Sequence, residues 1–159
     1  PDKIMAIGRL DHDSEGLLLL TTDGMKSFQV RDKGIEKEYY AQVDGEITQD
    51  AISQLQNGVN ISVNGTNYLT LPCKAFVLEN EPKLPARGRN IRGSSHGPTS
   101  WISITICEGK NRQIRKMTAA VGFATLRLVR VRIGDIHIDS MIAGEVVTLA
   151  NFDDALNCS

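Results

Sequence analysis

Short apolar and β-branched segments, separated by turn signals, recur along this sequence and constrain its fold more than any other feature. In Trp101–Ile106, isoleucine alternates with other residues, as in a half-buried strand. Asn64-Gly65 separates Ile61–Val63 from Thr66–Leu69, which predicts a tight hairpin. Further strands are expected at Ile4–Ile7, Leu17–Leu20, Tyr39–Val43, Leu71–Leu78, Leu126–Ile133 and Glu145–Leu149. The continuous apolar run Leu17–Leu20 suits a strand that is buried on both faces.

Helices are fewer than strands. Thr48 is a suitable N-cap for a helix over Gln49–Gln56, and Gly58 is suited to end it. An amphipathic pattern predicts a second helix over Arg112–Val121, and a short one is expected at Met25–Val30. Because hairpin-type turns join several strands, we expect one α+β domain over residues 1–159, with a mixed, mostly antiparallel sheet flanked by helices and loops.

The charges are unevenly distributed, although the formal net charge is only −1. Residues 1–80 hold 7 basic and 12 acidic side chains, whereas residues 81–159 hold 11 basic and 7 acidic ones. All 11 of those basic residues fall between Lys83 and Arg132, where Glu108 is the only acid. This pattern is typical of a surface that binds a phosphate backbone, and it also fits a solvated basic face without a partner.

Several classes of protein are disfavoured by what the sequence lacks. Cys73, Cys107 and Cys158 stand at no metal-ligand spacing, so we expect no metal, and their pattern fits a reducing cytoplasm. There is no Gly-rich phosphate loop. No apolar run approaches the roughly 20 residues of a membrane span. Nothing in the sequence requires more than a monomer.

Two segments carry residues suited to chemistry. Gly8–Gly16 holds three acids within five residues, just before an apolar run. Glu108–Met117 holds four basic residues that open or line one predicted helix. Taken singly, the first is more simply a polar turn and the second a solvated helix face.

Together these segments resemble the motifs of the RsuA/RluB/RluE/RluF family of RNA pseudouridine synthases. Gly8–Thr21 matches the nucleophile motif Gly-Arg-Leu-Asp-x-x-Ser-x-Gly-Leu-Leu-x-Leu-Thr, and Lys37-Glu38-Tyr39 matches a Lys-x-Tyr motif. Glu108–Met117, with the downstream Leu126–Gly134, matches the third motif. The similarity runs from about Ala6 to Val147 and is greatest to the RluE branch, by three further segments: Tyr39-Tyr40, Pro98–Trp101 and Leu126–Leu128. Members also carry an upstream strand, and many an S4-like domain, which this chain begins too late to contain.

The resemblance implies a pseudouridine synthase catalytic fold and the isomerisation of a specific uridine in 23S ribosomal RNA, without a cofactor. It assigns the nucleophile to Asp11 and an ion pair with that carboxylate to Arg115. It implies that Tyr39 stacks on the uracil and handles a proton, and that Ile114 belongs to an apolar wall. Because the target base must leave the stack, Arg9 is the candidate to fill its place.

The remaining basic residues are expected to contact the RNA backbone. These are Lys83, Arg87, Arg89, Arg92, Lys110, Arg112 and Lys116. Other functions stay open from the sequence alone: a non-catalytic module for ribosomal RNA binding or assembly, a sister synthase acting on another uridine, or an interaction domain whose basic segment is merely solvated.

Overall fold

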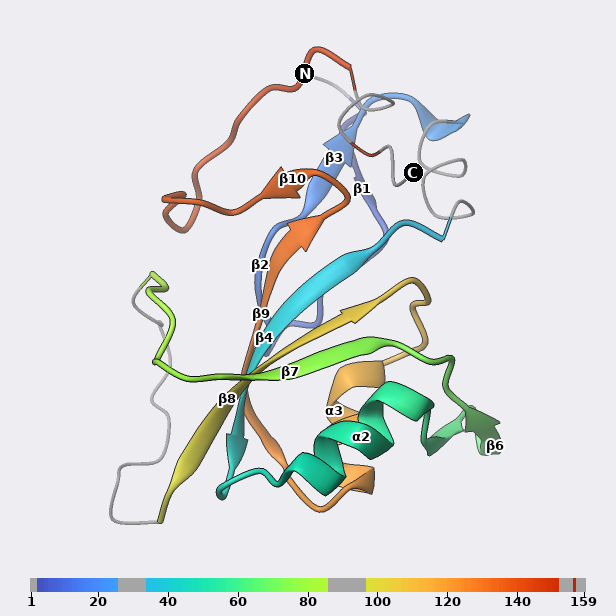
Figure 1. The fold of residues 1–159 in the computed structure, drawn as a ribbon. Coiled ribbons are helices and arrows are strands. Elements are labelled where there is room, and N and C mark those ends of the chain that lie inside the picture. Colours follow the sequence, from blue (N-terminus) through green and yellow to red (C-terminus); the bar gives the residue numbers. More distant parts are fainter. Residues whose placement is uncertain (1–2, 26–33, 86–96, 152–155, 157–159) are drawn as a thin grey trace.

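The computed structural model describes residues 3–25, 34–85, 97–151 and 156, and it forms an α+β fold as expected (Figure 1). The main sheet has six strands, and all its pairings are antiparallel except that of β2 with β9. Its members along the sheet are β10 (Ile136–His137), β9 (Thr125–Ile133), β4 (Lys37–Asp44), β8 (Thr99–Ile106) and β7 (Lys74–Leu78), while β2 (Glu15–Gly16) lies beside β9. Two smaller antiparallel pairs are β1 (Met5–Ile7) with β3 (Leu19–Thr21), and β5 (Asn60–Val63) with β6 (Thr66–Leu69).

Local sequence signals explain several elements directly. In α2 (Gln49–Asn57), the Thr48 hydroxyl accepts a hydrogen bond from the Ala51 amide at 3.1 Å, and Gly58 ends the helix with a φ of 99°. The predicted cap and stop are therefore confirmed. Asn64 and Gly65 both have positive φ at the turn between β5 and β6, as a tight hairpin requires.

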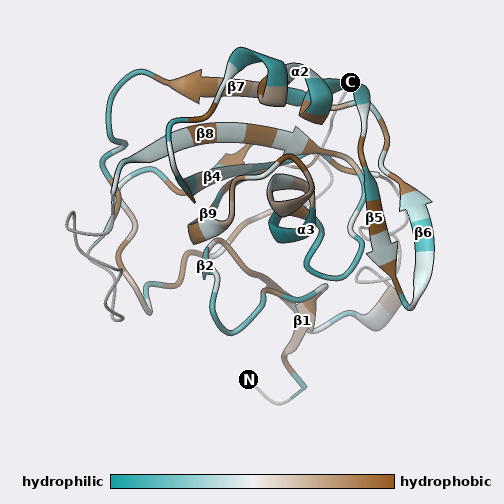
Figure 2. Cartoon of the chain, turned by 90° about the horizontal axis from the view of Figure 1, so that it is seen from below, coloured by the Kyte–Doolittle hydropathy of each residue, from teal (hydrophilic) through white to brown (hydrophobic). Residues whose placement is uncertain are grey.

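The main core lies between the sheet and both helices. Alternate residues of β4 and β8, such as Val43 and Ile102, pack in one cluster with Leu55 of α2 and Met117 of α3 (Gln113–Ala120). Figure 2 shows α3 beside β4 and β9, with the β5–β6 hairpin next to it. The helices thus cover one face of the sheet, and α3 brings its first turn to the end of β4 where Lys37 lies.

A second, smaller core fixes the first segment of the chain to the sheet. Ile7, Leu17 and Leu19 are buried in one cluster with Ile35 and Ile133. The Leu17 amide also donates to the Arg130 carbonyl at 3.0 Å. These contacts hold both ends of the acidic loop 8–16 near β9 and set the loop across from α3.

Four expectations differ from the structure or fall outside it. Residues 145–149 form no strand: Val146 and Val147 are largely exposed and pair with no strand among the described residues, so β propensity there has no partner edge. Leu17–Leu20 is buried on one face only, since Leu18 and Leu20 are exposed. Trp101–Ile106 is buried on both faces, because β8 lies between two neighbours in the sheet. The helix expected at Met25–Val30 lies, apart from its first residue, outside the described residues.

Candidate active site

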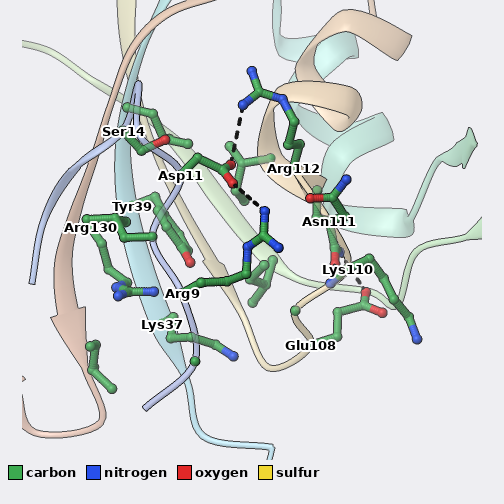
Figure 3. Close-up of a pocket in the computed structure, with 18 of the residues that line it drawn as sticks. Arg9, Asp11, Ser14, Lys37, Tyr39, Glu108, Lys110, Asn111, Arg112 and Arg130 are labelled. Atoms are coloured by element: carbon green, nitrogen blue, oxygen red, sulfur yellow. Dashed lines mark hydrogen bonds and ion pairs between the residues drawn. The ribbon is translucent and has the colours of Figure 1, made fainter. Parts of the chain in front are cut away.

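A cavity of about 700 Å³ separates the segment that carries Asp11 from one face of the main sheet (Figure 3). The segment Gly8–Ser14, together with the cations that bind it, is called the loop wall. Side chains of β4 and β9 form the opposite surface, called the sheet floor, which includes Lys37, Tyr39 and Arg130. Volumes of about 300–1,000 Å³ are usual for ligand sites, so the cavity is large enough for a small organic group.

Asp11 lies on the loop wall between two arginines. Its carboxylate is 4.0 Å from Arg9 and 3.6 Å from Arg112, which comes from a distant part of the chain. The Asp11 side chain is 17% exposed, whereas that of Arg9 is 82% exposed. The carboxylate is therefore accessible from the cavity, and Arg9 extends from the wall toward solvent.

Arg112 clamps the loop wall through a second carboxylate. Its guanidinium donates to both oxygens of Asp13, at 3.0 and 2.9 Å. This pair holds the pKa of Asp13 well below its usual range and raises the pKa of Arg112. Arg112 is the N-cap of α3 and has a left-handed backbone, with φ 52° and ψ 36°. Such a backbone is uncommon outside glycine and marks a position held by its surroundings.

Arg115, one turn further along α3, binds the backbone of the loop wall. It donates to the Asp13 carbonyl at 2.9 Å and to the Ser14 hydroxyl at 3.3 Å, and it lies 3.8 Å from the Asp13 carboxylate. Arg112 stands at 3.6 Å from the Asp11 carboxylate, and the ion pair with Asp11 that the resemblance implies for Arg115 stays a prediction.

The sheet floor carries the aromatic residue expected from the sequence, together with two cations that sequence reasoning gave no role. Tyr39 of β4 pairs in register with Arg130 of β9, and Lys37 stands two residues before Tyr39 on the same face. All three line the cavity. The Lys-x-Tyr motif and the downstream Leu126–Gly134 segment contained these cations, but a motif gives no indication of where a side chain points.

The two floor cations have different surroundings. Arg130 is 6% exposed, and its Nε and Nη2 both donate to the Leu17 carbonyl, at 2.8 and 2.6 Å. Lys37 is half-buried, and burial and the nearby charge of Arg130 lower its pKa from the ordinary value. Figure 3 shows both side chains on the same side of the cavity as Tyr39.

Gly16 lets the loop wall approach the floor. A Cβ at this position would lie 2.2 Å from the Arg130 carbonyl oxygen, and its φ of +110° is one that L side chains rarely adopt. Only glycine therefore permits the pairing of β2 with β9. This close approach gives a physical reason for the glycine of the nucleophile motif.

A half-buried carboxylate forms the rim on the α3 side. Glu108 accepts hydrogen bonds from the Tyr68 hydroxyl, the Leu71 amide at 2.8 Å and the Gln113 side chain at 2.9 Å. Burial raises the pKa of Glu108, but these hydrogen bonds outweigh burial and bring it below the ordinary value. Lys110 lies 5.0 Å from the centre of the Tyr68 ring, so the hairpin and the segment before α3 are joined at this rim.

The other expected site residues are distributed as follows. Ile114 is buried and lines the cavity, as does the exposed Lys110. Lys116 lies on α3 and is not part of the cavity lining. Arg87 and Arg89 lie outside the described residues.

Within the described ranges, no group of three or more His, Cys, Asp or Glu side chains is placed to hold a metal ion. No helix in those ranges is long and apolar enough to cross a membrane.

Comparison with known proteins gives concordant results. Residues 1–120 match the sequence model of a family described as RNA pseudouridylate synthase. The ribosomal large subunit pseudouridine synthase E of Vibrio parahaemolyticus is 42% identical over 145 residues, which make up 89% of this chain and 58% of that protein. The synthase of the same name from Xanthomonas axonopodis pv. citri is 41% identical and is covered to 73%.

Solved structures agree on the fold. A crystal structure of a pseudouridylate synthase superposes with a TM-score of 0.68 at 28% identity, over 86% of this chain and 51% of that one. The Cbf5-Nop10-Gar1 complex contains a chain that matches with a TM-score of 0.54 at 19% identity, which shows a shared fold alone.

Proposed function

Since this chain belongs to the RNA pseudouridylate synthase family, we propose that it isomerises a specific uridine of large-subunit ribosomal RNA to pseudouridine. One observation carries the proposal. The Asp11 carboxylate, bound by Arg112, opens into a cavity that has Tyr39 on its other side. A carboxylate and an aromatic ring around a space for a single flat base are the groups that this reaction needs.

The reaction transfers a glycosidic bond within one nucleotide. The N1–C1′ bond breaks and its electron pair leaves with the uracil, while a carboxylate oxygen of Asp11 bonds to C1′. The uracil then turns, and C5 donates an electron pair to C1′ and displaces the carboxylate. C5 loses its proton and N1 gains one, so the product has the composition of the substrate and no redox cofactor is required.

An ionised nucleophile must be kept in place inside a partly closed site. Arg112 and Arg9 stabilise the charge of Asp11, and the Asp13 pair fixes the direction of Arg112. Arg115 stabilises the backbone from which Asp11 extends. Ile114 supplies an apolar surface that excludes water.

The remaining roles concern the RNA. Tyr39 stacks on the extruded uracil and handles a proton, and the exposed Arg9 occupies the vacated place in the stack. Lys110 contacts phosphate groups at the rim, while Lys116, Arg87 and Arg89 add backbone contacts beyond it.

The expected cytoplasmic, monomeric state is part of the same proposal, and size-exclusion chromatography of the chain tests the monomer.

The test is release of tritium from large-subunit ribosomal RNA that carries 5-tritiated uridine. Asp11→Asn is expected to abolish release while RNA affinity stays within about twofold, because the substitution removes the nucleophile and leaves the binding surface. Asp50→Asn, at an exposed position of α2, is the matched control and retains activity. Appreciable release by Asp11→Asn would refute the assignment, and RNA binding without release by the unaltered chain would favour a non-catalytic module.

A sister synthase that modifies another uridine is the second candidate. The ribosomal large subunit pseudouridine synthase B of Yersinia pestis is 33% identical over 84% of this chain, although only 37% of that protein is covered. Carbodiimide modification and primer extension on ribosomal RNA, with and without the gene, locate the modified position and separate the two.

A further inference from the structure

Lys37 and Arg130 place two positive charges on the sheet floor beside Tyr39. Tyr39 and Arg130 are cross-strand neighbours, and Lys37 shares their face of β4. All three side chains line the cavity. The arrangement therefore presents two cations beside the ring on which the base is proposed to stack.

These two cations lack the nearby carboxylate that the other two cavity arginines, Arg9 and Arg112, have. Arg112 is paired with Asp13 at 2.9 Å. Neither Lys37 nor Arg130 has a carboxylate within 4.0 Å among the residues that the structure describes, and Arg130 donates only to a carbonyl. Two neighbouring like charges with little solvent are costly for folding, so their presence requires another explanation.

We propose that Lys37 and Arg130 bind the carbonyl oxygens of the extruded uracil and stabilise the negative charge that the base acquires when its glycosidic bond breaks. The inference rests on the proposed function and adds residues for its first step. As the N1–C1′ electron pair leaves with the uracil, the charge spreads over N1 and both carbonyl oxygens. Fixed cations aimed at such a developing charge lower the barrier more than they strengthen ground-state binding.

Depth in the cavity favours the base over a phosphate as the ligand. Arg130 is 6% exposed, whereas Arg9 is 82% exposed at the side chain and Lys110 is exposed at the rim. A phosphate remains on the outside of an RNA strand and meets the exposed cations first. Only the extruded base enters far enough to reach side chains beside Tyr39.

Lys37→Met is the informative variant. It removes the charge and keeps most of the apolar stem, so the fold is expected to be as stable as before or more stable, with an equal or higher melting temperature. The single-turnover rate of isomerisation is expected to fall about 100-fold or more, as for the loss of one donor to a developing anion. RNA affinity is expected to stay within about twofold, because the contact strengthens only as the bond breaks.

Two further variants complete the experiment. Lys74→Met is the matched control, since Lys74 lies on β7 with a largely exposed side chain outside the cavity and keeps full activity. Lys37→Arg restores a cation and is expected to recover most of the lost rate. A merely structural lysine would show neither the rescue nor a loss of rate without loss of stability.

Three results would overturn the inference. A normal rate for Lys37→Met shows that no charge stabilisation comes from this residue. Weakened RNA binding with a smaller salt dependence and an unchanged rate identifies a phosphate contact instead. A lowered melting temperature with failure of Lys37→Arg to restore activity identifies a packing role. If the unaltered chain itself forms no pseudouridine, the proposed function has failed, and that control is measured first.

Discussion

The loop wall and the sheet floor differ in whether their cations have a carboxylate at ion-pair distance. On the loop wall, Arg112 and Arg115 are within ion-pair distance of Asp13, and Arg112 also reaches Asp11. On the floor, neither Lys37 nor Arg130 has a carboxylate within 4.0 Å in the parts of the chain that the structure describes, and Lys37 is attracted by the more distant charge of Glu108. The cations of the loop wall are paired within the protein, whereas those of the sheet floor are available to bind a ligand.

The difference separates positioning from chemistry. Paired arginines cross-link the loop wall to α3, and charge-assisted hydrogen bonds of this kind fix direction as well as distance. Two cations without a carboxylate at ion-pair distance are costly for folding, but on a rigid sheet they provide an electrostatic environment that needs no rearrangement. Under the proposed function, one surface of this site holds the Asp11 carboxylate and the other receives the leaving base.

The junction of the two surfaces gives the largest expected effect. Gly16→Ala places a Cβ against the Arg130 backbone at a positive φ, so we expect it to lower the free energy of unfolding by about 3 kcal/mol or more and to abolish isomerisation. Gly122→Ala is the control, because its φ is +94° and the space beside it is open. The control is expected to cost about 1 kcal/mol. Urea denaturation measures both, and equal losses would mean that the β2–β9 contact has no role beyond backbone conformation.

Removal of a loop-wall arginine should lower the rate of isomerisation, whereas removal of a rim lysine should lower the affinity for RNA. Arg112→Leu and Arg115→Leu are each expected to slow single-turnover isomerisation by about 100-fold, because Asp11 loses a charge partner or its backbone support. Lys110→Ala is expected to weaken RNA binding and to reduce its salt dependence by about one ion, with little change in rate. Salt titrations and rapid quench distinguish these outcomes. A rate loss for Lys110→Ala equal to that for Arg115→Leu would make Arg115 a phosphate contact.

The ion pair of Asp13 with Arg112 makes the stability of the loop wall depend on pH in the acid range, and the floor has no such pair. Because the Asp13 pKa is lowered on folding, ionised Asp13 stabilises the protein above its unfolded pKa near 4, and this stability is lost as pH falls through the lowered value. Asp13→Asn is therefore expected to cost about 2 kcal/mol at pH 7, with the difference from the unaltered chain shrinking below about pH 4. Melting curves across this range test the sign. A difference independent of pH would show that the ionised pair contributes nothing to stability.

The sequence predicted the parts of the fold that depend on local signals. Thr48, Gly58 and Asn64-Gly65 specify their elements by short-range capping and turn geometry, and the structure has each of them. Residues 145–149 show the limit, since a β-branched segment forms a strand only where an edge is available to pair with it. The burial of β8 on both faces likewise depends on its place in the sheet, which alternation of residue types does not specify.

The candidate site shows the same division. Motif resemblance identified Asp11 and Tyr39, which line one cavity, but gave no indication that Arg112 stands beside the Asp11 carboxylate. Arg112 and Arg115 differ by three positions on one segment, and the structure places Arg112, which the resemblance gave only a backbone contact, at 3.6 Å from the Asp11 carboxylate. The roles of Lys37 and Arg130 emerge from a cross-strand register that no single segment contains.

At the rim, a carboxylate is bound mainly by neutral donors, and its removal is expected to change the rate of isomerisation least. Glu108 is satisfied mainly by neutral donors, two of which, Tyr68 and Leu71, come from the hairpin region. Glu108→Gln keeps the size of the side chain but weakens the bond from the Leu71 amide, so we expect a loss of about 1 kcal/mol. Because the hairpin is outside the contact between Asp11 and the floor, the rate of isomerisation should change less than about threefold. Hydrogen exchange should increase at the Leu71 amide while the amides of β4 stay protected. A large rate loss would mean that the rim positions Arg112 through the segment before α3, and the separation of the two surfaces would then have to include the hairpin.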